Sequence, residues 1–372
     1  MSNKRGTALV GLVPLYFFAF CGTLWKTNGL TKEIYVSKGD ERMKYTSLGR
    51  TGMQVSRLCL GTMNFGNATD EKEAFRIMDA ALDAGINYFD TSNNYGGGDR
   101  CNFGLSEEII GRWFAQGGNR RERTIIATKV YFRMDDPNDG PNDRLGLSAY
   151  KIRRHIEGSL RRLQTDYVEL YQMHHVDRDV TWAELWGVFS DLVSAGKVVY
   201  VGSSNFAGRD LVQAQYEAEK YRFMGLATEQ HRYNLMGRLP ELEVLPAAHD
   251  FGIGVVPYSP LNGGLLSENA LNKSVGQRTQ MAKERRMNET VRKQLEDYHA
   301  LCQELGEKES NVALAWLLKN PAITAPITGP RTVEQLENSL RAVEIDLSDD
   351  VMKRLDEIFP GPGGAAPNAY AW

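Results

Sequence analysis

Four titratable side chains of different types each follow or end a short apolar run of the chain: Asp90, Tyr95, Lys129 and His174. A phenol with an ordinary pKa of about 10 is a poor proton donor at neutral pH, but a neighbouring ammonium favours the phenolate and eases release of the proton. Lys129 could serve Tyr95 in this way, and Asp90 could hold the lysine charged and aimed. His174 could donate a hydrogen bond to the oxygen that receives the proton. The set therefore has the groups needed to protonate a carbonyl oxygen.

The elements that must position these residues are predicted from the alternation of apolar runs, which begins at Met43. A hairpin is indicated around residues 49–52, where Gly-Arg-Thr-Gly separates two short alternating runs. The first helix is expected between Asp70, a typical N-cap, and Gly85, a typical stop. Strands are expected at 56–61, 86–92, 124–130, 167–174, 198–204, 225–230, 253–259 and 323–329. Further helices are expected at 105–116, 148–164, 181–196, 209–221, 239–252, 291–305, 311–320 and 332–343.

About eight strand-then-helix units predict an α/β chain that closes into a (β/α)8 TIM barrel, with an N-terminal β-hairpin and long loops at the C-terminal face. In such barrels the working residues lie at the carboxyl ends of the strands. Asp90, Lys129 and His174 stand at three such ends, so the four titratable residues should converge on one rim. The same reasoning adds polar residues from later strands to this rim: Ser203, Ser204, Asn205, Gln230, Tyr258 and Ser259.

Composition excludes several classes of partner. The chain has 372 residues, 42% of them hydrophobic, and a net charge of -3, which offers no basic field for nucleic acid. Its four cysteines lie far apart, without a C-x-x-C pair or clustered histidines, so neither a metal site nor a disulfide framework is expected. A reducing, cytoplasmic compartment fits this pattern best.

The first 42 residues differ from the rest. An uncharged and mostly apolar run covers residues 6–25 and follows Lys4 and Arg5, and it is long enough to span a bilayer. Three interpretations stay open: a dispensable extension, a membrane anchor and a cleaved export signal. Residues 43–372 are expected to form the barrel domain by themselves.

Seven stretches, in order, carry a resemblance to a known family: "GINYFDTSNNYG", "IIATKV", "DYVELYQMHHVD", "GKVVYVGSSNF", "EQHRYNL", "VVPYSPLNGGLL" and "PITGPRTVEQLENSL". The region from about Met43 to Val343 resembles the aldo-keto reductases. In that family a nicotinamide cofactor delivers hydride to a carbonyl carbon while a tyrosine protonates the oxygen. The resemblance implies that Tyr95 is this proton donor, assisted by three further residues, Lys129, Asp90 and His174.

The sequence has no G-x-G-x-x-G between a strand and a helix, so a cofactor would not be bound as in a Rossmann fold. The resemblance implies another set of cofactor-binding residues. Ser204, Asn205 and Gln230 would hold the nicotinamide carboxamide, and Tyr258 would stack beneath the ring. The pyrophosphate would lie near Ser259, Leu261 and Gly263. The adenosine end would meet Gly329, Arg331, Gln335 and Asn338. Arg331 is a candidate partner for a 2′-phosphate, which favours NADPH over NADH. The family's usual Glu-Asn pair is Asn338-Ser339 here, a departure at the adenine contacts.

Other functions stay open at this stage. The potassium-channel β-subunits resemble this family and bind the cofactor while regulating a membrane protein, and the apolar run at 6–25 suits such a role. A barrel hydrolase or aldolase with Lys129 as Schiff-base former is a third possibility, but it gives no role to Tyr95 or to the segments that resemble a cofactor site. The oligomeric state is not indicated.

The substrate is expected to be a small carbonyl compound bound by the loops at 96–105, 131–146 and 359–372. Candidate pocket walls in these loops are Tyr131, Phe132, Tyr370 and Trp372. Residues 273–286 are expected to form a solvated loop at the rim.

Overall fold

The computed structural model describes residues 43–96, 103–272 and 277–363. The extension at 1–42, with its apolar run, lies outside this range, as do Tyr370 and Trp372. Among the described helices, none combines the length and the hydropathy that crossing a bilayer requires.

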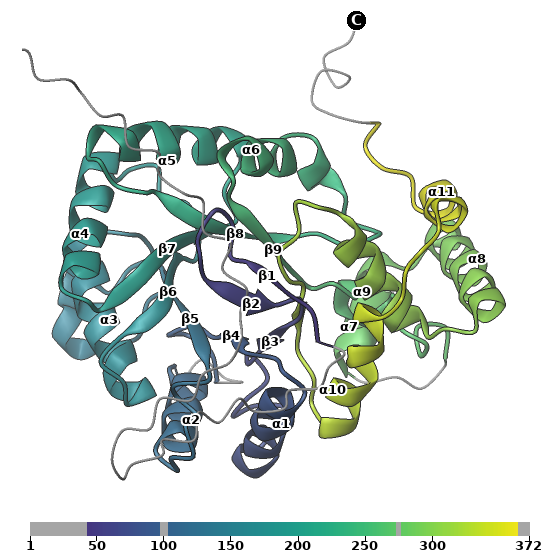
Figure 1. Ribbon diagram of the computed structural model, residues 1–372, viewed down its shortest axis with the longest axis horizontal. Coiled ribbons are helices and arrows are strands. Elements are labelled where there is room, and N and C mark those ends of the chain that lie inside the picture. The colour runs from purple at the N-terminus through teal and green to yellow at the C-terminus, as the bar shows by residue number, and fades with distance from the viewer. Residues whose placement is uncertain (1–42, 97–102, 273–276, 364–372) are drawn as a thin grey trace, which may run out of the picture. The chain divides into compact units, whose positions relative to one another are not determined.

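Eight parallel strands form a nearly closed barrel (Figure 1). Their order around the sheet is β10-β3-β4-β5-β6-β7-β8-β9, and an isolated parallel bridge from Val255 to Ile323 links the two edges. The strands are β3 Cys59–Gly61, β4 Tyr88–Asp90, β5 Ile125–Val130, β6 Val168–Met173, β7 Val198–Ser204, β8 Leu226–Arg232, β9 Gly254–Tyr258 and β10 Ile327–Thr328. The predicted (β/α)8 barrel is confirmed.

Helices connect successive strands and lie around the barrel (Figure 1). They are α1 Glu71–Asp83, α2 Leu105–Phe114, α3 Ala149–Leu163, α4 Trp182–Ser194, α5 Gly208–Lys220, α6 Val244–Phe251, α7 Gln277–Arg286, α8 Glu289–Leu305, α9 Glu309–Lys319, α10 Val333–Leu340 and α11 Asp349–Ile358. Short 3-10 turns lie at Pro137–Asn142, Leu239–Glu241, Asn262–Gly264 and Arg341–Val343.

The predicted hairpin is present as β1 (Tyr45–Ser47) and β2 (Gln54–Ser56), which pair antiparallel. Its inward side chains Leu48 and Val55 are fully buried and pack with residues of the barrel strands, Cys59, Tyr88, Ala127, Leu170, Val256 and Ala325. A second and larger cluster of apolar side chains fills the space between strands and helices. The hairpin thus extends the core inside the barrel.

The first helix illustrates how local sequence sets an element. The Asp70 carboxylate accepts a hydrogen bond of 2.9 Å from the Glu73 amide, which caps the helix as predicted. Gly85 follows the helix in the left-handed region, with φ of 82°. A Cβ there would lie 2.9 Å from the Tyr45 hydroxyl oxygen, so the position requires glycine both for its backbone angle and for space.

One expectation at the rim was wrong. Residues 277–286 form helix α7 and not a solvated loop. The segment is rich in strong helix formers, and Ala282 is buried against the core.

Proline changed two further elements. The helix expected at 239–252 divides into the 3-10 turn Leu239–Glu241 and helix α6, which begins at Val244, because Pro246 has no amide proton and fits only in the first turn of a helix. The strand expected at 323–329 shortens to β10, because Pro326 has no amide to donate to a ladder. Helix α11, capped by the Ser348 side chain, has no counterpart in the sequence prediction.

Candidate active site

Lys129 lies at the centre of the four predicted residues. Its side chain is fully buried on β5, and each of its three ammonium protons has an acceptor within reach. The Nζ atom donates to Asp90 Oδ2 at 2.7 Å, to the Thr91 carbonyl at 2.7 Å and to the Tyr95 hydroxyl at 3.2 Å. Three acceptors around one ammonium fix its position, so Lys129 is held against the Tyr95 oxygen.

The charge of Lys129 follows from the same contacts. Burial lowers the pKa of its ammonium, but the Asp90 carboxylate and the Tyr95 oxygen raise it by more, so the pKa lies above the ordinary value. Asp90 is itself held by the amide groups of Gln230, at 2.7 Å, and Gln172, at 3.2 Å, which both donate to its Oδ1. The result is a buried, charged and hydrogen-bonded ion pair beside a phenol.

The backbone after β4 brings Tyr95 over this pair. The Tyr95 amide donates to the Ser92 carbonyl, and the Tyr95 carbonyl accepts from the Ser106 amide at the start of α2. Gly96 follows with φ of 114°, and a Cβ there would lie only 2.5 Å from the Ser106 amide nitrogen. This tight turn requires glycine, and it sets the direction in which the preceding phenol leaves the backbone.

His174 follows β6 and faces the Tyr95 ring edge-on, with the ring centroids 5.8 Å apart. Its ring is packed between Tyr95 and Phe132, and Phe132 is 4.9 Å away by centroid. Burial, with Lys129 and His175 nearby, lowers the pKa of His174 well below its ordinary value. The imidazole is therefore neutral at physiological pH.

A cavity of about 680 Å³ opens over these residues, within the range of pockets that bind cofactors. Its lining includes the following predicted site residues: Asp90, Tyr95, His174, Ser204, Asn205, Gln230, Tyr258, Ser259, Leu261, Gly263, Gly329, Arg331, Gln335 and Asn338. Lys129 is absent from the lining because it is fully buried, and it reaches the cavity through Asp90 and Tyr95. The structure therefore brings the predicted catalytic and cofactor-binding residues together around one cavity.

The residues expected near a nicotinamide form a connected group after β7 and β9. Asn205 has a left-handed backbone, with φ of 61°. Its side-chain Nδ2 donates to the His174 backbone carbonyl at 3.1 Å. The Tyr258 hydroxyl donates to Asn205 Oδ1 at 2.8 Å. The side-chain nitrogen of Gln230 donates to Asp90, which leaves its Oε1 to accept a hydrogen bond from a carboxamide.

The segment after β9 has a backbone suited to anions. Four of its residues have positive φ: Ser259 at 52°, Asn262 at 49°, Gly263 at 76° and Gly264 at 97°. Successive amides in such conformations can form a concave nest for phosphate groups. Two arginines lie at this segment, because Arg232 and Arg286 both donate to the Asn262 side-chain oxygen. The residues present thus fit a pyrophosphate.

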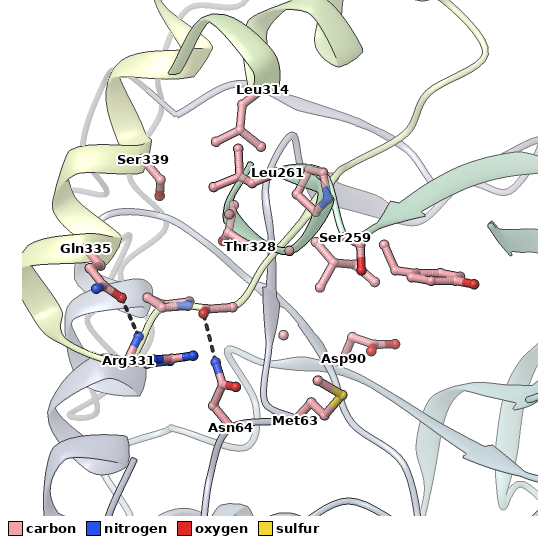
Figure 2. A pocket seen from close by; sticks show the side chains of 18 of the residues that line it. Met63, Asn64, Asp90, Ser259, Leu261, Leu314, Thr328, Arg331, Gln335 and Ser339 are labelled. Carbon is pink, nitrogen blue, oxygen red and sulfur yellow. Dashed lines mark hydrogen bonds between the residues drawn. The ribbon is translucent and has the colours of Figure 1, made fainter. Parts of the chain in front are cut away.

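The opposite end of the cavity lies at the start of α10 (Figure 2). The Gln335 side chain accepts a hydrogen bond of 2.9 Å from the Arg331 amide, and Asn64 donates to the Gly329 carbonyl at 2.9 Å. Asn338 accepts a bond of 2.8 Å from Lys308. Arg331 is half-buried, beside a helix N-terminus that favours anions.

The comparison with protein families matches residues 57–359 to the "Aldo/keto reductase family". The chain belongs to the aldo/keto reductase family. It is 64% identical to "Uncharacterized oxidoreductase YrpG" of Bacillus subtilis (strain 168) over 330 residues, which cover 89% of this chain and all of that protein. It is 32% identical to an aldo-keto reductase of Fusarium vanettenii, over 86% of this chain and 91% of that protein. A probable voltage-gated potassium channel subunit beta of Oryza sativa subsp. japonica is 30% identical, over 85% of this chain and 96% of that protein.

As an aldo/keto reductase the chain is an NAD(P)H-dependent oxidoreductase, of a family that acts on small carbonyl compounds. Its predicted substrate wall is present in part. Phe132 lines the cavity, whereas Tyr131 does not and instead packs against His175 with centroids 5.3 Å apart. Lys151 of α3 closes this loop by donating to the carbonyls of Tyr131 and Arg144.

Several residues of this reductase site were missed by the sequence analysis. Met63 and Asn64 follow the first barrel strand and line the cavity, so the rule that polar residues after each strand matter should have included Asn64. Gln172 of β6 was also missed, although its side chain donates to Asp90 Oδ1. Asn94 lines the cavity and Ser92 contacts His174, and both follow strand β4, so the same rule should have included them.

Proposed function

We propose that this protein reduces an aldehyde or ketone to an alcohol with NADPH, and that Tyr95 is the proton donor. The observation that supports this most directly is the position of the charged Lys129 ammonium between the Asp90 carboxylate and the Tyr95 oxygen at the base of the cavity. The activity is assigned to residues 43–372, the range that contains the cavity-lining residues of the described part of the chain.

The chemistry divides among the residues of the site as follows. Bound nicotinamide would supply the hydride to the carbonyl carbon. Tyr95 gives its proton to the carbonyl oxygen, and the positive charge of Lys129 stabilises the phenolate that remains. Asp90 keeps Lys129 charged. His174, which is neutral, orients the carbonyl by a hydrogen bond to the same oxygen.

The preference for NADPH is supported by charge at the adenosine end. Arg331 lies on the cavity wall beside the N-terminus of α10, where both a guanidinium and the helix amides favour a phosphate. The nest at Ser259–Gly264 would hold the pyrophosphate, with Asn205 and Gln230 Oε1 at the carboxamide.

Two other functions are an aldolase and a regulatory subunit. A Schiff-base lysine needs a lowered pKa, whereas the pKa of Lys129 is raised, which disfavours an aldolase. A regulatory subunit remains a second candidate, because one relative carries the name of a potassium channel subunit beta.

The test is an initial-rate assay of the full chain with NADPH and NADH against a panel of aldehydes and ketones, followed by absorbance. We expect turnover with at least one carbonyl and a higher kcat/KM with NADPH. Tight NADPH binding without turnover, together with recovery of the protein in a membrane complex, would support the regulatory subunit instead.

A further inference from the structure

A hydrogen-bonded chain of three residues leads from the loop after β4 to His174. The Ser92 hydroxyl donates to Asn94 Oδ1 at 2.7 Å, and Ser92 Oγ lies 3.1 Å from His174 Nδ1. Ser92 is fully buried, and Asn94 lines the cavity. Neither residue belongs to the group of four described above.

Counting the protons in this chain gives the tautomer of His174. A serine hydroxyl has one proton, and here Asn94 accepts it. The contact between Ser92 Oγ and His174 Nδ1 is therefore a bond donated by Nδ1–H. A neutral imidazole has only one N–H, so Nε2 has none. In this state His174 can accept a hydrogen bond at Nε2 but cannot donate one to a carbonyl oxygen.

The same chain can run in the opposite direction with the same heavy-atom positions. Turning the Asn94 amide by 180° lets its Nδ2 donate to Ser92 Oγ, and Ser92 then donates to His174 Nδ1. The single imidazole proton moves to Nε2, which becomes a donor. Asparagine permits both directions because its amide has a donor and an acceptor.

We propose that Ser92 and Asn94 are positioning residues that convert His174 from a hydrogen-bond acceptor into a donor when a carbonyl substrate binds. The inference rests on the proposed function, because only a carbonyl oxygen, which has no proton of its own, requires the donor state. The free protein holds the acceptor state, and the lone pairs of the substrate select the other.

The charged surroundings of His174 are what force this choice. Lys129 and His175 lie near the ring and disfavour a second proton on it, as does its burial against Tyr95 and Phe132. The Asp90 carboxylate of the site is paired with Lys129. A doubly protonated imidazole, which would donate at both nitrogens, is therefore unfavourable near neutral pH.

Substitutions of Asn94 distinguish the two directions in which the hydrogen bonds from Asn94 through Ser92 to His174 can run. Asn94→Asp can only accept, so it should lock His174 in the acceptor state and lower kcat/KM about 100-fold at pH 8. Its added negative charge also makes a second proton on His174 easier to bind, so this loss should shrink to less than about 10-fold at pH 6. Asn94→Ala frees the Ser92 proton for His174 and should cost less than about 10-fold at either pH.

Controls separate this effect from added charge or lost packing. Asn67→Asp places the same charge on an exposed loop position outside the cavity lining and should leave kcat/KM unchanged. Ser92→Ala should lower kcat/KM about 10-fold without a new pH dependence, and Ser92→Thr, which keeps the hydroxyl, should restore it. Equal losses in Asn94→Asp and Asn94→Ala, or a loss in Asn94→Asp that is the same at pH 6 and pH 8, would overturn the proposal.

A second measurement tests the proposed tautomers directly and requires no known substrate. The ¹⁵N shifts of the imidazole nitrogens report the tautomer in the free protein, and His174→Gln identifies the His174 signals. We expect Nδ1–H in the parent and in Asn94→Asp, and Nε2–H in Asn94→Ala. An Nε2–H tautomer in the parent, or the same tautomer in the parent and both Asn94 variants, would show that Ser92 and Asn94 do not set the tautomer of His174. A parent with the expected tautomers and no carbonyl turnover would instead contradict the proposed function.

Discussion

The two ends of the cavity are built in different ways. At the catalytic end, Lys129 and Asp90 are almost completely buried, and Gln172 and Gln230 satisfy the carboxylate. At the other end, where we propose that the adenosine of the cofactor binds and which we call the adenosine end, Gln335 is exposed and Arg331 is half-buried. In burial, the catalytic end resembles a protein core and the adenosine end resembles a protein surface. This difference indicates that the chemistry is fixed by packing, whereas cofactor preference depends on a few replaceable side chains.

The largest effect is expected when the buried ammonium of the catalytic end is removed. Lys129→Met should lower kcat/KM at least about a thousand-fold, because Tyr95 loses its charged neighbour. It should also lower the free energy of unfolding by about 3–5 kcal/mol, since Asp90 is left buried without a cation. Enzyme kinetics and urea unfolding measure the two effects. A stable variant would contradict the core-like description of this end.

A change at the adenosine end should affect binding and nothing else. Arg331→Ala should weaken NADPH binding about ten- to a hundred-fold, the value of charge-assisted hydrogen bonds to a phosphate, and should leave NADH binding and kcat nearly unchanged. Fluorescence titration with both cofactors measures this, and thermal unfolding should show no shift. An equal loss for NADPH and NADH would mean that Arg331 does not contact a 2′-phosphate.

The pH dependence of stability should also distinguish the two ends. The pKa of His174 in the folded protein lies well below that of the unfolded chain, so below about pH 6.5 the unfolded state binds a proton that the folded state does not. Stability should therefore fall as the pH falls, with this histidine adding up to about 1.4 kcal/mol per pH unit. His174→Gln should show a shallower slope in urea unfolding between pH 7 and pH 5. Gln335→Leu, at the other end, should leave the slope unchanged, and a slope identical in all three proteins would contradict the assignment.

The smallest effect is expected at the departure from the family pattern. Asn338 bonds to Lys308 in an exposed setting, so Asn338→Ala should change the NADPH Kd by less than about fivefold. Asn338→Glu restores the family residue and serves as the comparison. A loss as large as that of Arg331→Ala would show that this end is more rigid than its exposure indicates.

The catalytic end was predictable from sequence because its residues interrupt apolar strands. Asp90 and Lys129 occupy positions where a buried strand would otherwise have an apolar side chain, and the order of strands around a barrel places such positions on one rim. Alternation along the chain also predicted the barrel and its hairpin.

The hydrogen bonds that position the catalytic residues could not be predicted from the sequence, because they join residues that are far apart along it. The bond between Ser92 and His174 joins positions 82 residues apart, and Gln230 reaches Asp90 across 140 residues. The tautomer that we propose for His174 rests on the contacts of Ser92 with His174 and with Asn94. Helix α7 was missed because a polar, charged segment shows no apolar face, and its order depends on Ala282 packing against the core.

The measurement that tests the central claim most directly compares Tyr95→Phe with the parent in NADPH binding and in carbonyl turnover. The substitution removes only the hydroxyl that Lys129 contacts. We expect kcat to fall at least about a thousand-fold while the Kd for NADPH changes less than about twofold. Turnover within about a tenth of the parent rate would mean that the proton comes from another group, and the assignment of Tyr95 would be wrong.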